Sequence, residues 1–272
     1  MHEGAAALKA KWAGGEAVVG PLIQLPAPGL VEIFGAAGFD FAVADLEHGA
    51  LNLETTEHMM RAAAAAGITS GIRVPSNTPE HISTALNLGA DLIIVPHVDG
   101  VAAAEAAVAA AKFAPQGMRG VCPFVRAATY SATKDSGFYA DANASTIVNV
   151  LLEGTDAVAE LDGILEVPGV DVISLAPYDL SQALGVTGQT QHPLVIDLVA
   201  DACRRAEGHG KVIGFFAEEP ATAAEWIGRG VRWMTSSVET QIIYAAAKRW
   251  LGELETSLGR LPVGAGAGTE DR

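Results

Sequence analysis

Short apolar segments alternate with longer segments of helical composition along nearly the whole chain. The short segments are rich in Val, Ile and Phe and mostly lack polar alternation, which is typical of strands buried on both faces. We expect strands over residues 17–25, 41–45, 69–74, 91–96, 147–153, 171–176, 211–216 and 232–236. We expect helices over residues 29–37, 54–66, 79–88, 101–113, 155–165, 193–208, 220–228 and 238–251. Such alternation favours a parallel sheet whose strands are connected by helices.

The number of these segments indicates how the sheet is arranged. Eight strands and eight helices within 272 residues match a (β/α)8 barrel, the TIM barrel, in count and in length. The competing fold is an open doubly wound sheet, but the chain has neither the G-x-G-x-x-G loop nor the Walker A motif typical of it. We therefore predict a single α/β barrel domain over residues 1–258 and a disordered tail over 259–272. The longest irregular stretch, residues 115–145, is predicted to be a functional loop.

The charge balance excludes several classes of partner. The chain has 17 basic and 32 acidic residues, which give a formal net charge of −15. We expect no nucleic-acid partner and no membrane-surface partner, because both carry negative charge and no Lys/Arg cluster is present to bind them. The sequence shows no signal peptide and no membrane span. Cys122 and Cys203 fit no metal-binding spacing, so we expect reduced thiols in a cytoplasmic protein.

Ionisable and polar side chains follow several of the expected strands at the point where each strand ends. They are Asp45, Glu47 and His48 after the second strand, Arg73 at the third, Glu153 at the fifth, and Tyr178 and Asp179 after the sixth. In a parallel barrel the carboxyl ends of all strands meet at one end, where active sites are built. The sequence therefore predicts one site that combines these residues.

Glu153 and Asp179 are expected at neighbouring strand ends and form the candidate metal site. Two carboxylates without a Cys or His cluster favour Mg²⁺ or Mn²⁺ over zinc. Each carboxylate also has a simpler interpretation, since a Glu at a strand end is often only exposed and Asp179 can cap the helical turn that follows it.

His48 is the candidate general base, because an imidazole can exchange protons near neutral pH. Asp45 is positioned to orient that imidazole, although a purely structural histidine stays an alternative. The other histidines are interpreted as structural or exposed, and only His97, which follows the fourth strand, stays open as a further candidate.

Arg73 is a fixed cation at a strand end, suited either to clamp a carboxylate or to stabilise an enolate oxygen. A salt bridge to a neighbouring barrel carboxylate is the alternative. An imine-forming aldolase would need a lysine inside the barrel. Lys211 lies at the wrong end of its strand, and the other candidate lysines lie on expected helices or in the long loop. The residues therefore favour metal-dependent enolate chemistry.

The segment Asp45-Leu46-Glu47-His48-Gly49 resembles the D-x-E-H signature of the metal-dependent (class II) pyruvate aldolases. That family includes 4-hydroxy-2-oxoheptanedioate aldolase and 2-keto-3-deoxy-L-rhamnonate aldolase, and it is related to the citrate lyase β-subunit and the malyl-CoA lyases. The resemblance extends over residues 18–251 and continues through 72–75, 86–90, 117–120, Glu153 and 176–185, in the same order and with similar spacing.

This resemblance implies a divalent metal, Mg²⁺ or Mn²⁺ with Co²⁺ as a further candidate, on Glu153 and Asp179. It implies Arg73 at the keto oxygen and a His48–Asp45 dyad that moves a proton through metal-bound water. The implied reaction is the reversible cleavage of a 4-hydroxy-2-oxo acid, through a metal-bound enolate, to an aldehyde and pyruvate or hydroxypyruvate.

The resemblance also implies roles for neighbouring residues. Glu47 would support the water ligands of the metal, and backbone N–H groups near Tyr178 and Asp179 would hold the substrate carboxylate. Family members usually assemble as homohexamers built from three dimers, with the last helix reaching over a neighbour.

Three departures from the family pattern bear on the second substrate. Leu151 stands where the family often has Gln, two residues before Glu153, the metal ligand that the resemblance implies. Asn87 replaces an Asp that would act across a subunit boundary. The loop over residues 120–124 is bulkier than its counterpart in the family. The identity of the aldehyde, the preferred metal and the physiological direction stay open at this level.

Two other functions compete with the aldolase. An acyl-CoA lyase of the citryl- or malyl-CoA type needs a groove for a large anionic cofactor, and the net charge of −15 argues against one. A non-catalytic metal-binding barrel belongs to a different class of protein, and the retention of every ionisable residue in the candidate set argues against it.

Overall fold

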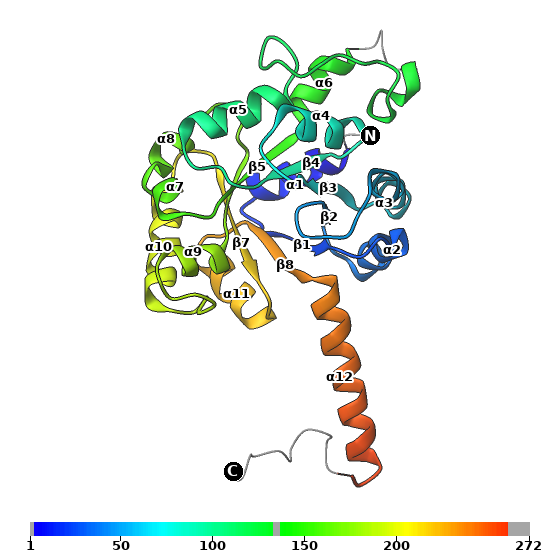
Figure 1. Cartoon of the computed structure of the whole chain (residues 1–272), viewed down its shortest axis with the longest axis vertical. Coiled ribbons are helices and arrows are strands. Elements are labelled where there is room, and N and C mark those ends of the chain that lie inside the picture. Colours follow the sequence, from blue (N-terminus) through cyan, green and yellow to red (C-terminus); the bar gives the residue numbers. More distant parts are fainter. Residues whose placement is uncertain (1–2, 133–136, 261–272) are drawn as a thin grey trace.

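The computed structural model describes residues 3–132 and 137–260, and its sheet is a closed parallel barrel (Figure 1). Each strand pairs with the next one along the chain, and β8 pairs with β1. The strands are β1 Val18–Ile23, β2 Phe41–Asp45, β3 Thr69–Arg73, β4 Leu92–Val95, β5 Ile147–Leu152, β6 Val172–Leu175, β7 Val212–Ala217 and β8 Trp233–Val238. The predicted (β/α)8 barrel in a single domain is therefore confirmed.

Helices follow the strands as the alternation predicted. They are α1 Glu3–Ala13, α2 Pro28–Ala37, α3 Leu53–Ala66, α4 Pro79–Asn87, α5 Val101–Ala111, α6 Phe138–Ser145, α7 Thr155–Ala159, α8 Leu161–Leu165, α9 Pro177–Ala183, α10 Pro193–Ala206, α11 Pro220–Gly228 and α12 Glu239–Ser257, with a 3-10 segment η1 over Arg126–Ser131. Local signals place their ends: the Thr78 side chain accepts a hydrogen bond from the His81 N–H at the start of α4, and Gly67 ends α3 in the left-handed conformation.

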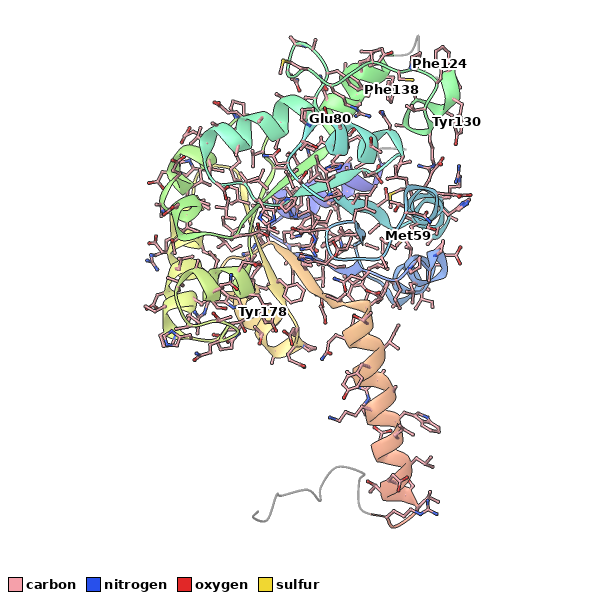
Figure 2. The ribbon with its side chains drawn as sticks, in the orientation of Figure 1. Met59, Glu80, Phe124, Tyr130, Phe138 and Tyr178 are labelled. Atoms are coloured by element: carbon pink, nitrogen blue, oxygen red, sulfur yellow. The ribbon has the colours of Figure 1, made fainter. Side chains whose placement is uncertain are left out.

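Three helices, α1, α6 and α9, lie outside the ranges in which the sequence predicted helices. Helix α1 packs at the N-terminal end of the barrel, where Leu8 is buried and Trp12 contacts the ring of Trp233, the first residue of β8. It buries few apolar side chains, so its sequence has no clear helical periodicity. Helix α6 lies within the stretch predicted to be a loop, and Phe113 and Phe138 form a small separate core there. Figure 2 shows Phe124, Tyr130 and Phe138 together in this part of the molecule.

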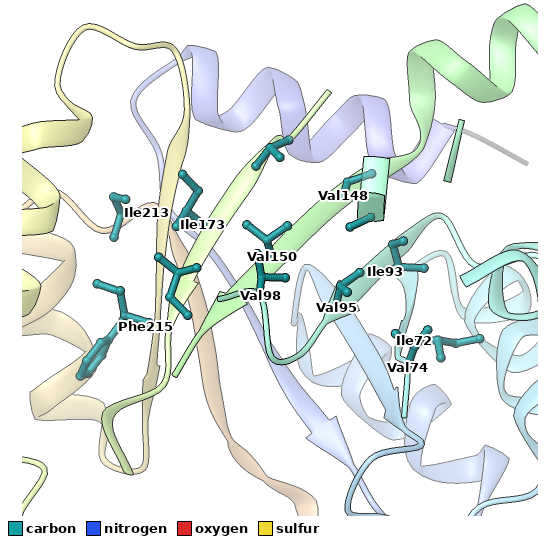
Figure 3. Packing of buried hydrophobic residues seen from close by; sticks show 14 of the residues in the cluster. Ile72, Val74, Ile93, Val95, Val98, Val148, Val150, Ile173, Ile213 and Phe215 are labelled. Atoms are coloured by element: carbon teal, nitrogen blue, oxygen red, sulfur yellow. The ribbon is translucent and has the colours of Figure 1, made fainter. Parts of the chain in front are cut away.

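Side chains on each strand alternate between the barrel interior and the outer layer under the helices. The outer layer contains Ile72, Ile93, Val148 and Ile173 (Figure 3). The interior contains Phe41, stacked on Trp233 with ring centroids 3.9 Å apart. Asp45 lies four residues after Phe41 on β2, so its side chain points into the barrel as that of Phe41 does. The lower part of the interior is thus apolar, and polar side chains enter it at the carboxyl end of the strand.

Helix α12 projects away from the barrel (Figure 1) and ends six residues beyond its predicted end at 251. Among the residues described, no helix is long and apolar enough to cross a membrane. Of the predicted tail, Gly259 and Arg260 follow α12, and the remainder from 261 onward lies outside the described residues.

Candidate active site

Asp45 and Arg73 form a bidentate ion pair across β2 and β3, which align these two residues in register. Nε of Arg73 lies 2.8 Å from Oδ1 of Asp45, and Nη2 lies 2.7 Å from Oδ2. The Asp45 side chain is fully buried. Burial alone would raise the pKa of Asp45, but the hydrogen bonds and charge of Arg73, aided by the Gln24 amide and the His48 N–H, hold this pKa below its ordinary value. The salt bridge considered as an alternative role for Arg73 is therefore present.

The structure differs from the predicted contact between Asp45 and the His48 ring. Oδ1 of Asp45 accepts the backbone N–H groups of Glu47 and His48, at 3.1 and 3.3 Å. The Arg73 guanidinium and the Gln24 side-chain amide donate the other hydrogen bonds to this carboxylate. The His48 ring is 62% exposed, and its Nε2 lies 3.8 Å from Oε2 of Glu47. Asp45 thus shapes the turn that carries His48 and does not orient the imidazole directly.

Glu47, His97 and Glu153 form a compact cluster whose possible ligand atoms all lie within 4.8 Å of one another. Nδ1 of His97 is 2.5 Å from Oε2 of Glu153, and Nε2 of His97 is 3.3 Å from Oε1 of Glu47. Nη1 of Arg73 lies 3.2 Å from Oε2 of Glu47. The sequence left His97 as an open candidate, and its place directly after β4 was the only signal for this contact.

The pKa of Glu153 reflects its burial and its carboxylate neighbours. Burial is the main cause that raises the pKa of Glu153 to about 7, and the charges of Glu47 and Asp179 raise it further, whereas His97 lowers it. Asp179 lies in the first turn of α9, and its charge contributes to the raised pKa of Glu153. The cluster of possible ligand atoms contains Glu153 together with Glu47 and His97, and Asp179 is not among its members.

The donor set fits a divalent cation. Oε2 of Glu47 is buried and makes no hydrogen bond, although Nη1 of Arg73 lies 3.2 Å away. A cation beside these carboxylates would satisfy that oxygen and relieve their mutual repulsion. Oxygen ligands suit Mg²⁺ and Mn²⁺, and the imidazole of His97 is also compatible with transition metals.

A cavity of about 560 Å³ opens beside the ion pair, lined by His48, Arg73, Tyr178 and Asp179 at the site already described. The Tyr178 hydroxyl contacts the Glu218 carboxylate at the cavity wall (Tyr178 is labelled in Figure 2). Leu151, one of the departures from the family pattern, lines the same cavity and gives its wall an apolar surface.

Asn87, the second departure, has a partner within its own chain. Nη2 of Arg119 lies 2.9 Å from Oδ1 of Asn87, and the Arg119 guanidinium lies 4.5 Å from the centre of the Phe113 ring. Asn87 therefore helps to attach the segment after α5 to the end of α4.

Comparison with known proteins supports the family resemblance that the sequence motifs indicated. The model of the HpcH/HpaI aldolase/citrate lyase family matches residues 22–245. A 2-dehydro-3,6-dideoxy-6-sulfogluconate aldolase from Pseudomonas putida is 30% identical over 239 residues, which cover 88% of this chain and 93% of the relative. A 5-keto-4-deoxy-D-glucarate aldolase from Shigella dysenteriae is 30% identical over 241 residues, with 89% and 93% covered.

Solved structures share the barrel. An HpcH/HpaI aldolase/citrate lyase family protein from Burkholderia cenocepacia is 29% identical, with a TM-score of 0.87 over 94% of this chain and 100% of the other. The citrate synthase SbnG is 30% identical, with a TM-score of 0.83 over 93% and 99% of the two chains. A citrate lyase β subunit from M. tuberculosis, complexed with oxaloacetate and magnesium, shares the fold at 13% identity and a TM-score of 0.55, over 86% and 95% of the chains.

Proposed function

Because the chain belongs to the HpcH/HpaI aldolase/citrate lyase family, we propose that it is a metal-dependent aldolase. Its substrate would be a 4-hydroxy-2-oxo acid, cleaved reversibly to an aldehyde and pyruvate or hydroxypyruvate. The observation that carries this proposal is that Arg73, which lines the cavity together with His48 and Asp179, holds Asp45 in a buried ion pair and contacts Glu47 of the carboxylate cluster. Both curated relatives are named as aldolases of keto-deoxy sugar acids, which supports the reaction class.

Glu153 and Asp179 would hold the cation, with Glu47 and His97 beside them. Mg²⁺, Mn²⁺ and Co²⁺ are the candidates, and the magnesium complex of the distant citrate lyase β subunit supports the first. A divalent cation bound there supplies Lewis-acid polarisation of the substrate's keto oxygen.

Arg73 would stabilise the negative charge that develops on the same oxygen. Asp45 engages two of the five guanidinium N–H groups and fixes the plane of the side chain. Nη1 also lies 3.2 Å from Oε2 of Glu47, and Arg73 lines the cavity. A cation held rigidly before the reaction needs no reorganisation as charge develops. The backbone N–H groups near Tyr178 and Asp179 would receive the substrate carboxylate.

His48 would move the proton. During cleavage the 4-hydroxyl loses its proton to the imidazole, the C3–C4 bond breaks, and the bonding electrons remain on the 2-oxo acid until C3 is protonated. The exposed ring lines the cavity and is free to exchange that proton with solvent. Glu47, 3.8 Å from Nε2, would stabilise the imidazolium.

Chelation and borohydride trapping test the reaction class directly. We expect the purified enzyme to release pyruvate from a 4-hydroxy-2-oxo acid, to lose this activity in EDTA, and to recover it when Mg²⁺, Mn²⁺ or Co²⁺ is restored. Borohydride in the presence of substrate should leave the activity intact. Activity that survives EDTA and disappears on borohydride treatment would contradict the proposal and favour an imine-forming enzyme.

Two alternatives remain testable in the same assay. An acyl-CoA lyase would cleave citryl- or malyl-CoA, but Asp179 and Glu218 add negative charge to the cavity wall, and this disfavours a large anionic cofactor. A non-catalytic metal-binding barrel would bind the cation and turn over neither class of substrate.

We also propose that α12 joins copies of this chain into a homo-oligomer, a hexamer built from three dimers as the family resemblance implies. Among its 19 residues only Glu239 is buried, whereas Tyr244 and Trp250 are 61% and 63% exposed. Ile243, Trp250 and Leu254 lie on one face of the helix, since their spacing of seven and four residues follows helical periodicity.

The double variant Trp250→Glu/Leu254→Glu is therefore expected to dissociate the assembly into smaller species in sedimentation velocity, because two charges would enter a buried apolar contact. Ala245→Glu, on the opposite face of α12, is the matched control and should sediment as the wild type does. Unchanged sedimentation of the double variant would show that this face is not the interface.

A further inference from the structure

We infer that Ser174 and Ser237 form a subsite for hydroxyl groups of the substrate's carbon chain, at the end of the cavity walled by β6, β7 and β8. This inference rests on the proposed aldolase function and extends it to the substrate class. The cavity of about 560 Å³ lies within the range that encloses ligands larger than a three-carbon acid. The part of the substrate beyond the 2-oxo acid must therefore contact cavity residues other than those proposed to take part in the reaction.

Ser174 presents a buried hydroxyl without a partner. The residue is 5% exposed, and its Oγ makes no hydrogen bond although it lines the cavity. Ser174 pairs with Gly214 across β6 and β7. A Cβ atom at position 214 would lie 2.2 Å from that Oγ, so the glycine leaves the space in which the hydroxyl lies. Buried hydroxyls are nearly always hydrogen-bonded, and a ligand in the cavity is the available partner.

Ser237 presents a second unpartnered hydroxyl in a strained backbone conformation. It is 3% exposed, lines the same cavity, and has a φ of 61°, in the left-handed region that favours glycine. Gly20 pairs with Thr235 and Leu22 with Val238, so β8 contains one residue more than β1 at this point. Such a bulge redirects a side chain and is common beside active sites. Serine at a position where glycine would fit better points to a use for the hydroxyl.

The charges around these hydroxyls indicate what they bind. Thr235 lines the cavity beside them, and its Oγ1 already accepts the indole N–H of Trp233. Among the described lining residues Arg73 is the permanently charged cation, and Asp45 neutralises it. Glu218 adds a carboxylate to the wall. The subsite therefore suits an uncharged hydroxylated chain, and it disfavours a second carboxylate, a sulfonate or a phosphate on the aldehyde part.

Aldehyde competition in the addition direction tests this subsite. With pyruvate and the metal-loaded protein, we expect kcat/KM for D-glyceraldehyde to exceed that for propanal, which has the same carbon chain without hydroxyls, and that for succinic semialdehyde, which carries a second carboxylate. Ser237→Gly and Ser174→Ala should each lower the glyceraldehyde-to-propanal ratio about fivefold to tenfold, because one hydrogen bond is lost. Ser236→Ala, one residue along β8, is the control and should leave the ratio unchanged.

Ser237→Gly also keeps the test independent of folding. Glycine accepts the left-handed conformation without strain, so the thermal midpoint of this variant should equal or exceed that of the wild type. An unchanged ratio in both serine variants, or a wild-type preference for succinic semialdehyde, would overturn the subsite.

Failure of the aldolase proposal gives a different result. If the wild type turns over no aldehyde, binding of two non-reacting acids, D-erythronate and butanoate, is compared by saturation-transfer NMR. Stronger binding of D-erythronate that is lost in Ser237→Gly would support the subsite without the aldolase. Equal binding of the two acids, or binding of neither, would overturn it.

Discussion

Glu153→Gln is expected to weaken divalent-cation binding by more than about a hundredfold and to reduce aldol cleavage at least as strongly, because changes to groups that only support metal ligands already cost tenfold to a hundredfold. Glu153 contacts Nδ1 of His97, and the charges of Glu47 and Asp179 oppose its ionisation. An amide keeps its shape and removes the negative charge. Calorimetric titration with Mn²⁺ and a pyruvate-release assay measure the two effects.

The same variant is expected to stabilise the metal-free protein. The pKa of Glu153 is raised from 4.5 to about 7 in the folded protein, so its ionisation there is unfavourable. The folded state binds the extra proton between these two pH values, and stability therefore falls as pH rises through that window, by about 3 kcal/mol. At pH 8 in EDTA, Glu153→Gln should unfold at a higher temperature than the wild type.

Glu105→Gln, on the exposed side of α5, is the matched control and should change neither property. Cation affinity retained within threefold in Glu153→Gln would contradict the assignment of this carboxylate. A lower unfolding temperature in EDTA would show that burial and repulsion do not oppose its charge.

Arg73→Met is expected to destabilise the protein by about 3–5 kcal/mol and to lower turnover by about a hundredfold to a thousandfold. The substitution leaves the Asp45 carboxylate buried without its counter-charge and removes the cation beside Glu47. Chemical denaturation measures the first effect, and kcat/KM for the 4-hydroxy-2-oxo acid measures the second.

A double variant separates the two roles of Arg73. Arg73→Met/Asp45→Asn should recover part of the lost stability, because the asparagine oxygen still accepts backbone N–H groups and no unpaired charge remains at position 45. It should not recover activity. Arg61→Met, which breaks an exposed pair with Glu57 on α3, should leave the unfolding transition nearly unchanged. Full activity in Arg73→Met would show that the guanidinium does not act on the substrate.

The residues of the candidate site were predictable because a parallel barrel collects its strand ends. Asp45, Arg73 and Glu153 lie at the ends of segments that the sequence predicted to be strands, and Asp179 follows another, so a parallel barrel places all four at the same end. Their partners were not predictable in the same way. Asp45 is three residues from His48 in the chain, yet its carboxylate binds Arg73, because the β2–β3 register sets these two side chains opposite each other inside the barrel.

The fold shows the same division. The apolar segments of the sequence located the eight strands. Helix α1 was not predicted, because it is stabilised by contacts with the lower barrel, such as that of Trp12 with Trp233, and not by a pattern in its own sequence. The stretch that contains α6 packs around a separate core that includes Phe113 and Phe138, and no local sequence pattern predicts that core.

The sequence by itself determined the barrel, the reaction family and the end of the barrel at which the ionisable residues meet, because these depend on periodicity and on motifs within short segments. Only the tertiary structure decided that His97 joins Glu47 and Glu153, and that Ser237 turns its hydroxyl into the cavity. Both depend on contacts between distant strands: the first on the approach of the segment after β4 to β5, and the second on the bulge where β8 closes on β1. Such contacts depend on the register between strands and on the closure of the barrel, and neither can be read from the residues of one short segment.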